Sequence, residues 1–223
     1  MRISKRHNIT SIADFQLKMA DKAGKAVIDE YNRLLSGVDE PIANAPSYTT
    51  FIEAEQAYMA SERPERDRAF WRQRYPSVPP ALLPARFAMA NDSASTSGKL
   101  IWQMSRATFD DIQTYASKRG LTAPHFFLAL IHSYFSRITN AEEIVIGVPV
   151  HNRTKAQHKQ MLGMFSSINP IGVPVDTSRN FEAQMHAMAD ELKRCYRHQR
   201  LPISDINREV QLTRTGRRQM FDV

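Results

Sequence analysis

The side chains best suited to binding or catalysis gather between residues 151 and 176, in HNRTKAQHKQMLGMFSSINPIGVPVD. Two histidines, several cationic or amide side chains and a Gly-Met-Phe step lie there between two strand-like segments. Histidine exchanges a proton near neutral pH, and the other polar groups form hydrogen bonds with a loop backbone or a ligand. The function of this loop is the main question that the sequence raises.

A second arrangement with a catalytic spacing is His186 and Asp190, in HAMAD. Several acyltransferases use His-x-x-x-Asp with the histidine as general base, at a sharp turn that directs its ring into a channel. Here the pair falls inside a continuous helical pattern, where a spacing of four is worth only roughly 0.2–0.5 kcal/mol. We interpret it as a helix-stabilising pair, and His125 and His132, in an apolar helix, as core or edge histidines.

Other catalytic signatures do not occur in the sequence. There is no Gly-x-Ser-x-Gly, Cys-x-x-Cys, His-Glu-x-x-His, Walker loop or Gly-x-Gly-x-x-Gly, which argues against metal and nucleotide chemistry. Cys195 is the single cysteine, so an intrachain disulfide is excluded and a packing role in a reducing compartment is expected.

The formal net charge of +7 permits contact with phosphates or acidic partners, since positive potential attracts anions at long range. The cations are dispersed among acids, and no zinc-finger spacing or aromatic–basic motif is present. We therefore expect an ordinary solvated surface and no nucleic-acid partner. If an anionic partner binds, residues 207–220, NREVQLTRTGRRQM, are the place to look, with an acidic protein and a nucleic acid as equal alternatives.

No apolar run approaches the roughly 18 residues that a membrane helix needs. The start, MRISKRHNIT, is basic but lacks the following apolar core of a signal peptide. We expect a cytoplasmic protein with no membrane contact.

The elements that would position these residues follow from periodicity and breaker residues. Residues 1–75 form a helical lead-in with helices over 14–36, 48–61 and 64–75, and Gly37 and Pro64 at their boundaries. Residues 76–98 are a Pro/Ser-rich linker loop. Residues 99–223 alternate strands and helices and predict an α/β or α+β core with one mixed sheet. Its strands are expected over 99–105, 143–150 and 170–176, and its helices over 108–119, 123–138, 179–197 and 204–211.

Four segments, in this order and at these intervals, resemble the condensation domains of nonribosomal peptide synthetases. They are YTTFIEAEQAYMASERPERDRAFWRQRY, VIGVPVHNRT, LGMFSSINPI and YRHQRLPISDINREV. Each motif alone is weakly specific, but their combination is specific and spans residues 14–223.

The resemblance implies a chloramphenicol acetyltransferase-like lobe, a two-layer sandwich of one mixed sheet with helices. In the family, two such lobes enclose a tunnel into which two carrier proteins deliver phosphopantetheine-bound substrates. This chain resembles the second, C-terminal lobe, so residues 1–223 are expected to be a single partial condensation domain. No cofactor of its own is expected: phosphopantetheine would arrive on peptidyl or aryl carrier proteins, and the N-terminal condensation lobe would be a partner. A lone lobe would expose an apolar wall and self-associate.

The catalytic motif of the family is not intact. Members carry His-His-x-x-x-Asp-Gly just before the helix that corresponds to residues 15–36, and the second histidine is held to orient or deprotonate the attacking amine. Aligned on Asp14, that position is occupied by Thr10, which cannot act as a base near neutral pH. Placing His7 there instead puts Ser11 at the aspartate. The chain by itself is therefore expected to be inactive.

By the same resemblance, the loop after the strand over 143–150 runs to the channel between lobes. Polar groups there would fix the loop or hold a phosphopantetheine amide, although for Arg153 a structural turn is the preferred interpretation. Glycine at position 163 would let the backbone approach the channel closely. The candidate tunnel residues are Asn152, Arg153, Gly163, Ser166, Ser167 and Asn169.

Two functions remain open. The first is a lobe of an amide-forming condensation enzyme, and the second is a non-catalytic module that binds carrier proteins or another partner. A coenzyme A-dependent acyltransferase relative is a weaker third alternative. The altered motif around Thr10 favours the non-catalytic module for the chain in isolation.

Overall fold

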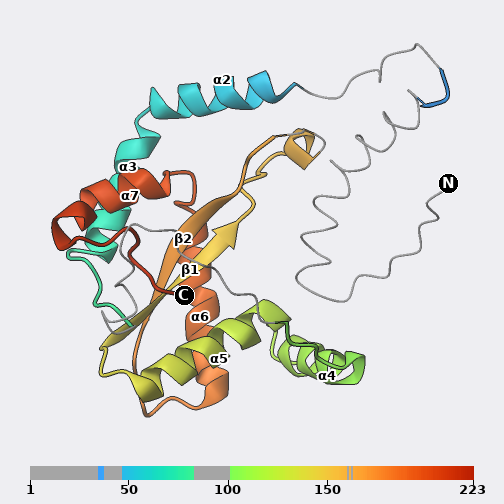
Figure 1. Cartoon of the computed structure of the whole chain (residues 1–223), viewed down its shortest axis with the longest axis vertical. Coiled ribbons are helices and arrows are strands. Elements are labelled where there is room, and N and C mark those ends of the chain that lie inside the picture. The colour runs from blue at the N-terminus through green and yellow to red at the C-terminus, as the bar shows by residue number, and fades with distance from the viewer. Residues whose placement is uncertain (1–34, 38–46, 83–100, 160, 162) are drawn as a thin grey trace, which may run out of the picture. The chain divides into compact units, whose positions relative to one another are not determined.

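The computed structural model describes residues 35–37, 47–82, 101–159, 161 and 163–223 (Figure 1). These residues fall into two compact units. The first unit comprises residues up to 63 together with 151–166, and the second comprises 64–150 and 167–223. Thr10 and Asp14, and the expected helix over 14–36 apart from its last residues, lie outside the described residues.

Two antiparallel strands form the sheet of the second unit: β1, Glu143–Val150, and β2, Ser167–Pro174. Val150 lies opposite Ser167, and the ladder runs without interruption to the far end of both strands. Residues 144–146 of β1 are all buried, so both faces of this strand are covered. The strand expected over residues 143–150 is confirmed.

The sheet departs from the expectation in two respects. Residues 101–105, expected to belong to a strand, have no regular structure, and Ile101 and Trp102 are 73% and 78% exposed. A strand needs a neighbour for its backbone hydrogen bonds, and the sheet of the described residues contains β1 and β2 alone. Since these two run antiparallel, the described sheet is not mixed. β2 also begins at residue 167 rather than 170, because the ladder starts opposite Val150.

The expected helices between residues 48 and 211 are present, each end within two residues of its predicted position. They are α2 (Tyr48–Met59), α3 (Arg63–Arg74), α4 (Arg106–Ser117), α5 (Ala123–Ile138), α6 (Phe181–Tyr196) and α7 (Ile203–Glu209). A short 3₁₀ turn, η3 (Leu212–Thr215), follows α7. Of the expected linker over 76–98, residues 76–82 are irregular and the rest lies outside the described residues.

Local hydrogen bonds explain where the helices begin. The Asn180 side chain accepts from the Ala183 backbone N–H at 2.8 Å at the start of α6. The Ser105 hydroxyl accepts from the Thr108 N–H at 3.1 Å at the start of α4. Each bond pairs a backbone donor that the first turn of a helix leaves without an intrahelical acceptor.

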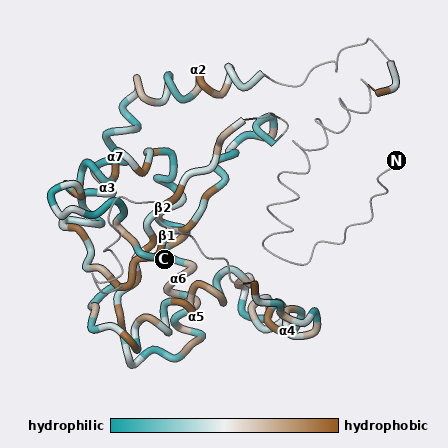
Figure 2. The backbone as a smooth tube through the Cα atoms, viewed as in Figure 1, coloured by the Kyte–Doolittle hydropathy of each residue, from teal (hydrophilic) through white to brown (hydrophobic). Residues whose placement is uncertain are grey.

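The core of the second unit lies where these helices meet the sheet. Helix α5 contacts β1, and α6 and α7 contact β2. The strands appear brown in the hydropathy colouring (Figure 2), in keeping with their buried isoleucines and valines. The largest side chains that are fully buried in this core include Trp71, Ile144, Ile171, Met188 and Met220.

The first unit holds α2, the loop over 151–166 and the 3₁₀ turn η2 (Gln157–Lys159) within that loop. Its own small core consists of Phe51, Met161 and Phe165, with Tyr48 packed against them. The rings of Phe51 and Phe165 lie 4.3 Å apart between centroids. Aromatic contacts of this kind hold the loop against α2.

No helix in the described part of the chain is long and apolar enough to cross a membrane.

Candidate functional site

The loop over 151–166 begins with a sharp change in backbone direction. Asn152 has a φ of 47°, in the left-handed region that asparagine tolerates better than most residues. The His151 Nδ1 accepts a hydrogen bond from the Arg153 backbone N–H at 3.0 Å. Together the two features turn the chain out of β1 and direct Arg153 toward the rest of the loop.

The Arg153 guanidinium binds the backbone of its own loop. It donates to the Met161 carbonyl at 2.9 Å, to the Gly163 carbonyl at 3.3 Å and to the carbonyl of His158. Its Cζ also lies 3.9 Å from the centroid of the Phe165 ring. Burial lowers the pKa of the guanidinium, with the Tyr48 side chain acting in the opposite direction. These contacts support a structural role for Arg153, and a direct contact with ligand stays a prediction.

Gly163 lies directly beneath an aromatic ring. Its φ is 153°, and a Cβ placed on it would overlap the ring carbons of Tyr48. The Tyr48 hydroxyl donates to the neighbouring Met164 carbonyl, which holds the ring over the glycine. Glycine permits a close approach here, and the group that approaches is a side chain of α2, whereas an approach to a substrate channel stays a prediction. Tyr48 was not among the candidates, because nothing in its local sequence indicates a partner so distant in the chain.

The three remaining candidates surround the start of β2. Ser166 is exposed, and its hydroxyl contacts the Met164 sulfur at 3.2 Å. Ser167 is half-buried as the first residue of β2, opposite Val150. Asn169 is fully buried, and among the described residues its side-chain oxygen and nitrogen have no hydrogen-bond partner. Burying an amide without hydrogen-bond partners costs free energy of folding. Asn169 is thus the candidate whose side-chain oxygen and nitrogen are not used by the fold.

The structure places the candidates in two groups. Asn152, Arg153, Gly163 and Ser166 belong to the first unit, whereas Ser167 and Asn169 belong to the second. Within the first group, Arg153 and Gly163 are joined directly by a hydrogen bond.

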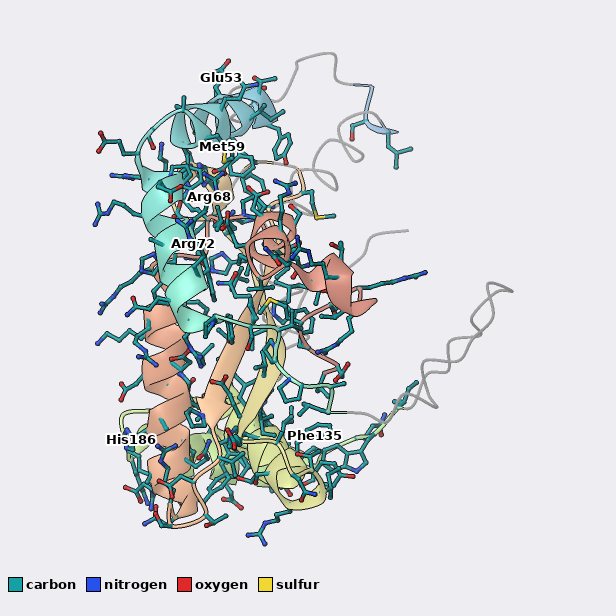
Figure 3. All side chains as sticks on the ribbon, turned by 90° about the vertical axis from the view of Figure 1, so that its left-hand side faces the viewer. Glu53, Met59, Arg68, Arg72, Phe135 and His186 are labelled. Atoms are coloured by element: carbon teal, nitrogen blue, oxygen red, sulfur yellow. The ribbon has the colours of Figure 1, made fainter. Side chains whose placement is uncertain are left out.

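Three histidines outside the loop, His125, His132 and His186, lie on helices α5 and α6. His132 is buried, and its Nε2 lies 2.9 Å from the Val173 carbonyl oxygen. Burial lowers the pKa of His132 and of His125, whose Nδ1 lies 3.1 Å from the Thr122 hydroxyl. His186 lies on the uninterrupted helix α6 (Figure 3). Both His186 and Asp190 are exposed, and the prediction of an unbroken helix there is confirmed.

A buried charge network that the sequence analysis missed joins three elements of the second unit. Arg74 of α3 donates to Glu191 of α6 at 2.5 Å, to Glu143 of β1 and to the Gly172 carbonyl at 2.5 Å. Burial opposes the charge of Arg74, but hydrogen bonds to the two carboxylates raise its pKa above the ordinary value. Burial, together with nearby Glu191, raises the pKa of the Cys195 thiol, so this cysteine is unreactive and packs in the core.

A second missed contact joins the start of α3 to the end of α6. The His198 Nδ1 lies 2.7 Å from Asp67 Oδ1, and the Phe70 ring stacks on the imidazole at 3.9 Å. The Trp71 indole N–H donates to the His198 carbonyl at 3.1 Å. With both its ring and its backbone engaged, His198 serves to position the two helices.

Comparison with known proteins agrees with this fold. The family model "Condensation domain" matches residues 24–223. The chain belongs to the condensation domain family. It is 28% identical over 200 residues to surfactin synthase subunit 1 of Bacillus subtilis, a match that covers 90% of this chain and 6% of that protein. It is 29% identical over 188 residues to a plipastatin synthase protein of the same organism, covering 84% of this chain and 7% of that one.

The first condensation domain of the calcium-dependent antibiotic synthetase, solved with a substrate analogue, has the same fold. It superposes with a TM-score of 0.63 at 23% identity, over 81% of this chain and 39% of that chain. The fold is therefore the α/β, chloramphenicol acetyltransferase-like one of condensation domains. These 223 residues span well under half of that solved domain and a small fraction of the synthases they match.

Proposed function

We propose that this chain is the second lobe of a nonribosomal peptide synthetase condensation domain. Combined with a first lobe, it would form an amide bond between two carrier-bound substrates. The observation that carries the proposal is the family match over residues 24–223. The relatives named as synthases of surfactin and plipastatin support the same class of reaction.

The reaction joins an amine to a thioester. The nitrogen of the acceptor attacks the thioester carbon of the donor, a C–N bond forms, and the C–S bond breaks. The donor's phosphopantetheine leaves as a thiol, and the proton lost by the amine returns to the sulfur or to solvent. Most of the acceleration in such a reaction comes from holding the two groups in attack geometry.

In this proposal the second lobe supplies positioning rather than a base. In the alignment on Asp14, Thr10 takes the position of the second histidine, and a threonine hydroxyl does not accept a proton near neutral pH; the alignment on His7 lacks the aspartate. The base and the opposite wall would come from the first lobe or from solvent. The loop over 151–166 would form this lobe's share of the wall, with Asn152, Ser166 and Ser167 as polar contacts for phosphopantetheine amides.

The rigidity of that loop supports this assignment. Arg153 binds three carbonyl groups of the loop, and Tyr48 closes over Gly163. A wall that orients two substrates must itself keep one shape, and a site braced by surrounding hydrogen bonds meets this need.

A second candidate function is a non-catalytic module that binds carrier proteins. The observation that favours it is ITSIADF, in which neither alignment restores the histidine motif. In this alternative the fold keeps its partner surface and performs no chemistry.

Complementation distinguishes the two functions. The chain is incubated with donor-loaded and acceptor-loaded carrier proteins, with and without a separately expressed first lobe that carries an intact motif. We expect no amide from the chain alone, since both the opposing wall and the base are lacking, and amide when the first lobe is added. Product from the chain alone would refute the division of roles. Absence of product in both mixtures, with carrier binding retained, would favour the non-catalytic module.

A further inference from the structure

The loop over 151–166 shares its compact unit with α2, although two strands of the other unit flank it in the chain. Tyr48 of α2 and Met164 of the loop are 116 residues apart in the sequence and are joined by a hydrogen bond. The position of the loop therefore depends on a helix that is distant along the chain.

Tyr48, the first residue of α2, contacts three successive residues of the loop. Its hydroxyl donates to the Met164 carbonyl, and its ring covers Gly163 at the place where a side chain would begin. The same ring meets that of Phe165 edge-on, with 5.3 Å between centroids. Phe51, one turn later on α2, adds an apolar contact with Phe165. Apolar contacts are not directional, whereas a hydrogen bond fixes direction as well as distance, so Tyr48 holds the loop more closely than the other rings do.

Two side chains hold neighbouring carbonyls of the loop. Arg153, within the loop, donates to the Gly163 carbonyl at 3.3 Å, and Tyr48 donates to the next carbonyl, that of Met164. Arg153 keeps the loop in one shape, because its donors and their acceptors belong to the same segment. Tyr48 ties that shape to α2, whose own first turn is capped by the Ser47 side chain. Substitution of Tyr48 therefore changes the anchoring of the loop and leaves its internal bracing in place.

We propose that Tyr48 is a positioning residue for the condensation reaction, through which α2 fixes the loop and the substrate contacts that the loop carries. The inference rests on the proposed function, in which Asn152 and Ser166 contact phosphopantetheine amides. Tyr48 itself contacts no substrate in this proposal and acts through Gly163 and Met164.

The same contacts make α2 and the loop one cooperative unit. The small core between them consists of Phe51, Met161 and Phe165, whereas the core of the second unit extends over several helices and both strands. A part of a protein with a small apolar core opens at a lower free energy than the rest. Loss of the Tyr48 contacts should therefore increase the opening of α2 and the loop together and leave the sheet closed.

Trypsin measures opening of the loop directly, since Lys155 and Lys159 are exposed within it. Tyr48→Ala should raise the rate of cleavage after these lysines by about tenfold or more, because a protease acts on the locally opened state. Tyr48→Phe keeps the ring and loses only the hydrogen-bond donor, so its increase should be smaller, about threefold. Cleavage after Lys118, at the end of α4 in the other unit, is the internal reference and should keep its rate.

Hydrogen exchange tests whether α2 and the loop open together. In Tyr48→Ala, the amides of both segments should exchange faster by the same factor, while those of β1 keep their wild-type rates. Ile52→Ala is the control on the same helix. Ile52 is 44% exposed, and its truncation should change neither the exchange rates nor loop cleavage by more than about twofold.

Kinetics of the complemented enzyme separate positioning from folding. With the first lobe present, Tyr48→Phe and Tyr48→Ala should raise KM for the carrier-bound substrate by about threefold and tenfold, with kcat within about twofold of wild type. The phosphopantetheine amides take no part in bond making, so a displaced loop weakens binding of substrate and transition state alike. A role confined to folding would instead lower the concentration of active enzyme, and with it the apparent kcat, at an unchanged KM. Ile52→Ala should retain both values.

Three results would overturn the proposal: wild-type loop cleavage in Tyr48→Ala, equal acceleration of cleavage after Lys118 and of exchange in β1, or a lower kcat at unchanged KM. The proteolysis outcome is separate from that of the complementation assay. Faster loop cleavage in Tyr48→Ala, in a chain that forms no amide with the first lobe, would support the coupling of α2 to the loop and reject the amide-forming function. Wild-type cleavage in Tyr48→Ala, with amide formed, would do the reverse.

Discussion

Arg153 shows how one side chain gives an irregular loop a fixed shape. A loop of this length carries many backbone carbonyls that no strand or helix pairs, and a guanidinium has five donors in a planar arrangement. Three of those carbonyls accept hydrogen bonds from Arg153, and the Phe165 ring packs against the guanidinium group of Arg153. Lysine could not replace it, since an ammonium is not planar and does not present its donors in this geometry.

Gly163 is expected to be intolerant of any side chain, for two separable reasons. Gly163→Ala should reduce the free energy of unfolding by about 1–3 kcal/mol, from a strained φ and from the contact with Tyr48. In a Tyr48→Ala background the same substitution should cost less, since only the backbone strain remains. Gly120→Ala is the matched control, because Gly120 has a φ of 70° and nothing within 4 Å of its would-be Cβ. A cost at Gly163 no greater than that at Gly120, measured by denaturant unfolding, would contradict the close approach.

Asn169 allows the cost of an unpaired amide to be measured. Asn169→Leu, which has the same branched shape, should leave stability unchanged or raise it by about 1 kcal/mol, because it removes buried polar atoms that have no described partner. Asn169→Asp should be destabilising, since it buries a charge. If the leucine variant instead lost a kilocalorie per mole or more in denaturant unfolding, the amide would have a structural partner after all.

The helices of the second unit are joined by charge as well as by apolar contact. Arg68 and Arg72 lie on α3 (Figure 3). Arg68 reaches Asp205 at 3.8 Å and Glu209 at 3.7 Å on α7, and Arg72 reaches Glu209 at 3.7 Å. Partly exposed pairs at these distances contribute little individually. Arg74 differs, because it shares with Arg194 the neutralisation of Glu191, which is only 2% exposed, so that its removal would leave a buried carboxylate with one counter-charge instead of two. Ion pairs therefore add to the apolar contacts between α3 and the helices α6 and α7.

The contact between α5 and β2 should make stability depend on pH. The pKa of His132 is lowered in the folded state by burial, so the unfolded chain binds the proton more tightly. The contribution of His132 to the free energy of unfolding is therefore fully present above pH 6.5, the ordinary pKa of histidine. It is lost as the pH falls below that value. His132→Gln keeps a donor for the Val173 carbonyl and does not titrate, so the decline in unfolding free energy on acidification should be shallower. His125, with a shift of the same sign, leaves a residual slope. An unchanged slope in His132→Gln would show that this histidine does not titrate on unfolding.

For the molecule as a whole, the exposed apolar side chains are as informative as the core. Leu130, Tyr134 and Ile138 follow one another at spacings of four on α5, and all three are exposed. A spacing of four keeps them on one face of the helix, opposite the side that enters the core. This stripe is the candidate for the uncovered apolar wall that is expected of a lone lobe, and that role stays a prediction.

Self-association of the isolated chain should depend on that stripe. We expect concentration-dependent association by sedimentation, because uncovered apolar patches associate in water. L130S/I138S should shift the chain toward monomer without lowering its thermal stability appreciably, since both side chains are already exposed. The control is I52S/M59S on α2, two other exposed apolar residues. Equal association by wild type and L130S/I138S would exclude the stripe as the contact.

Local patterns in the sequence determined most of the secondary structure. The spacing of apolar residues predicted the ends of α5 and α6 to within two residues, and a run of β-branched residues predicted β1. Each pattern indicates which side chains of the segment are buried on the same face. The residues that carry the family resemblance are also local, so the family could be inferred before the fold. The pattern failed over residues 101–105, because whether an extended segment becomes a strand depends on a neighbour that the segment does not contain.

Only the tertiary structure decided what the candidate side chains do. The sequence identified Arg153 and Gly163 as candidates but could not identify their partners. The Met161 carbonyl and the Tyr48 ring come close to them only when the chain is folded. The same holds for Arg74 with Glu191. Spacing along a chain predicts which face a side chain occupies. Its charge balance and its contacts depend on residues brought close by folding, sometimes more than a hundred positions away.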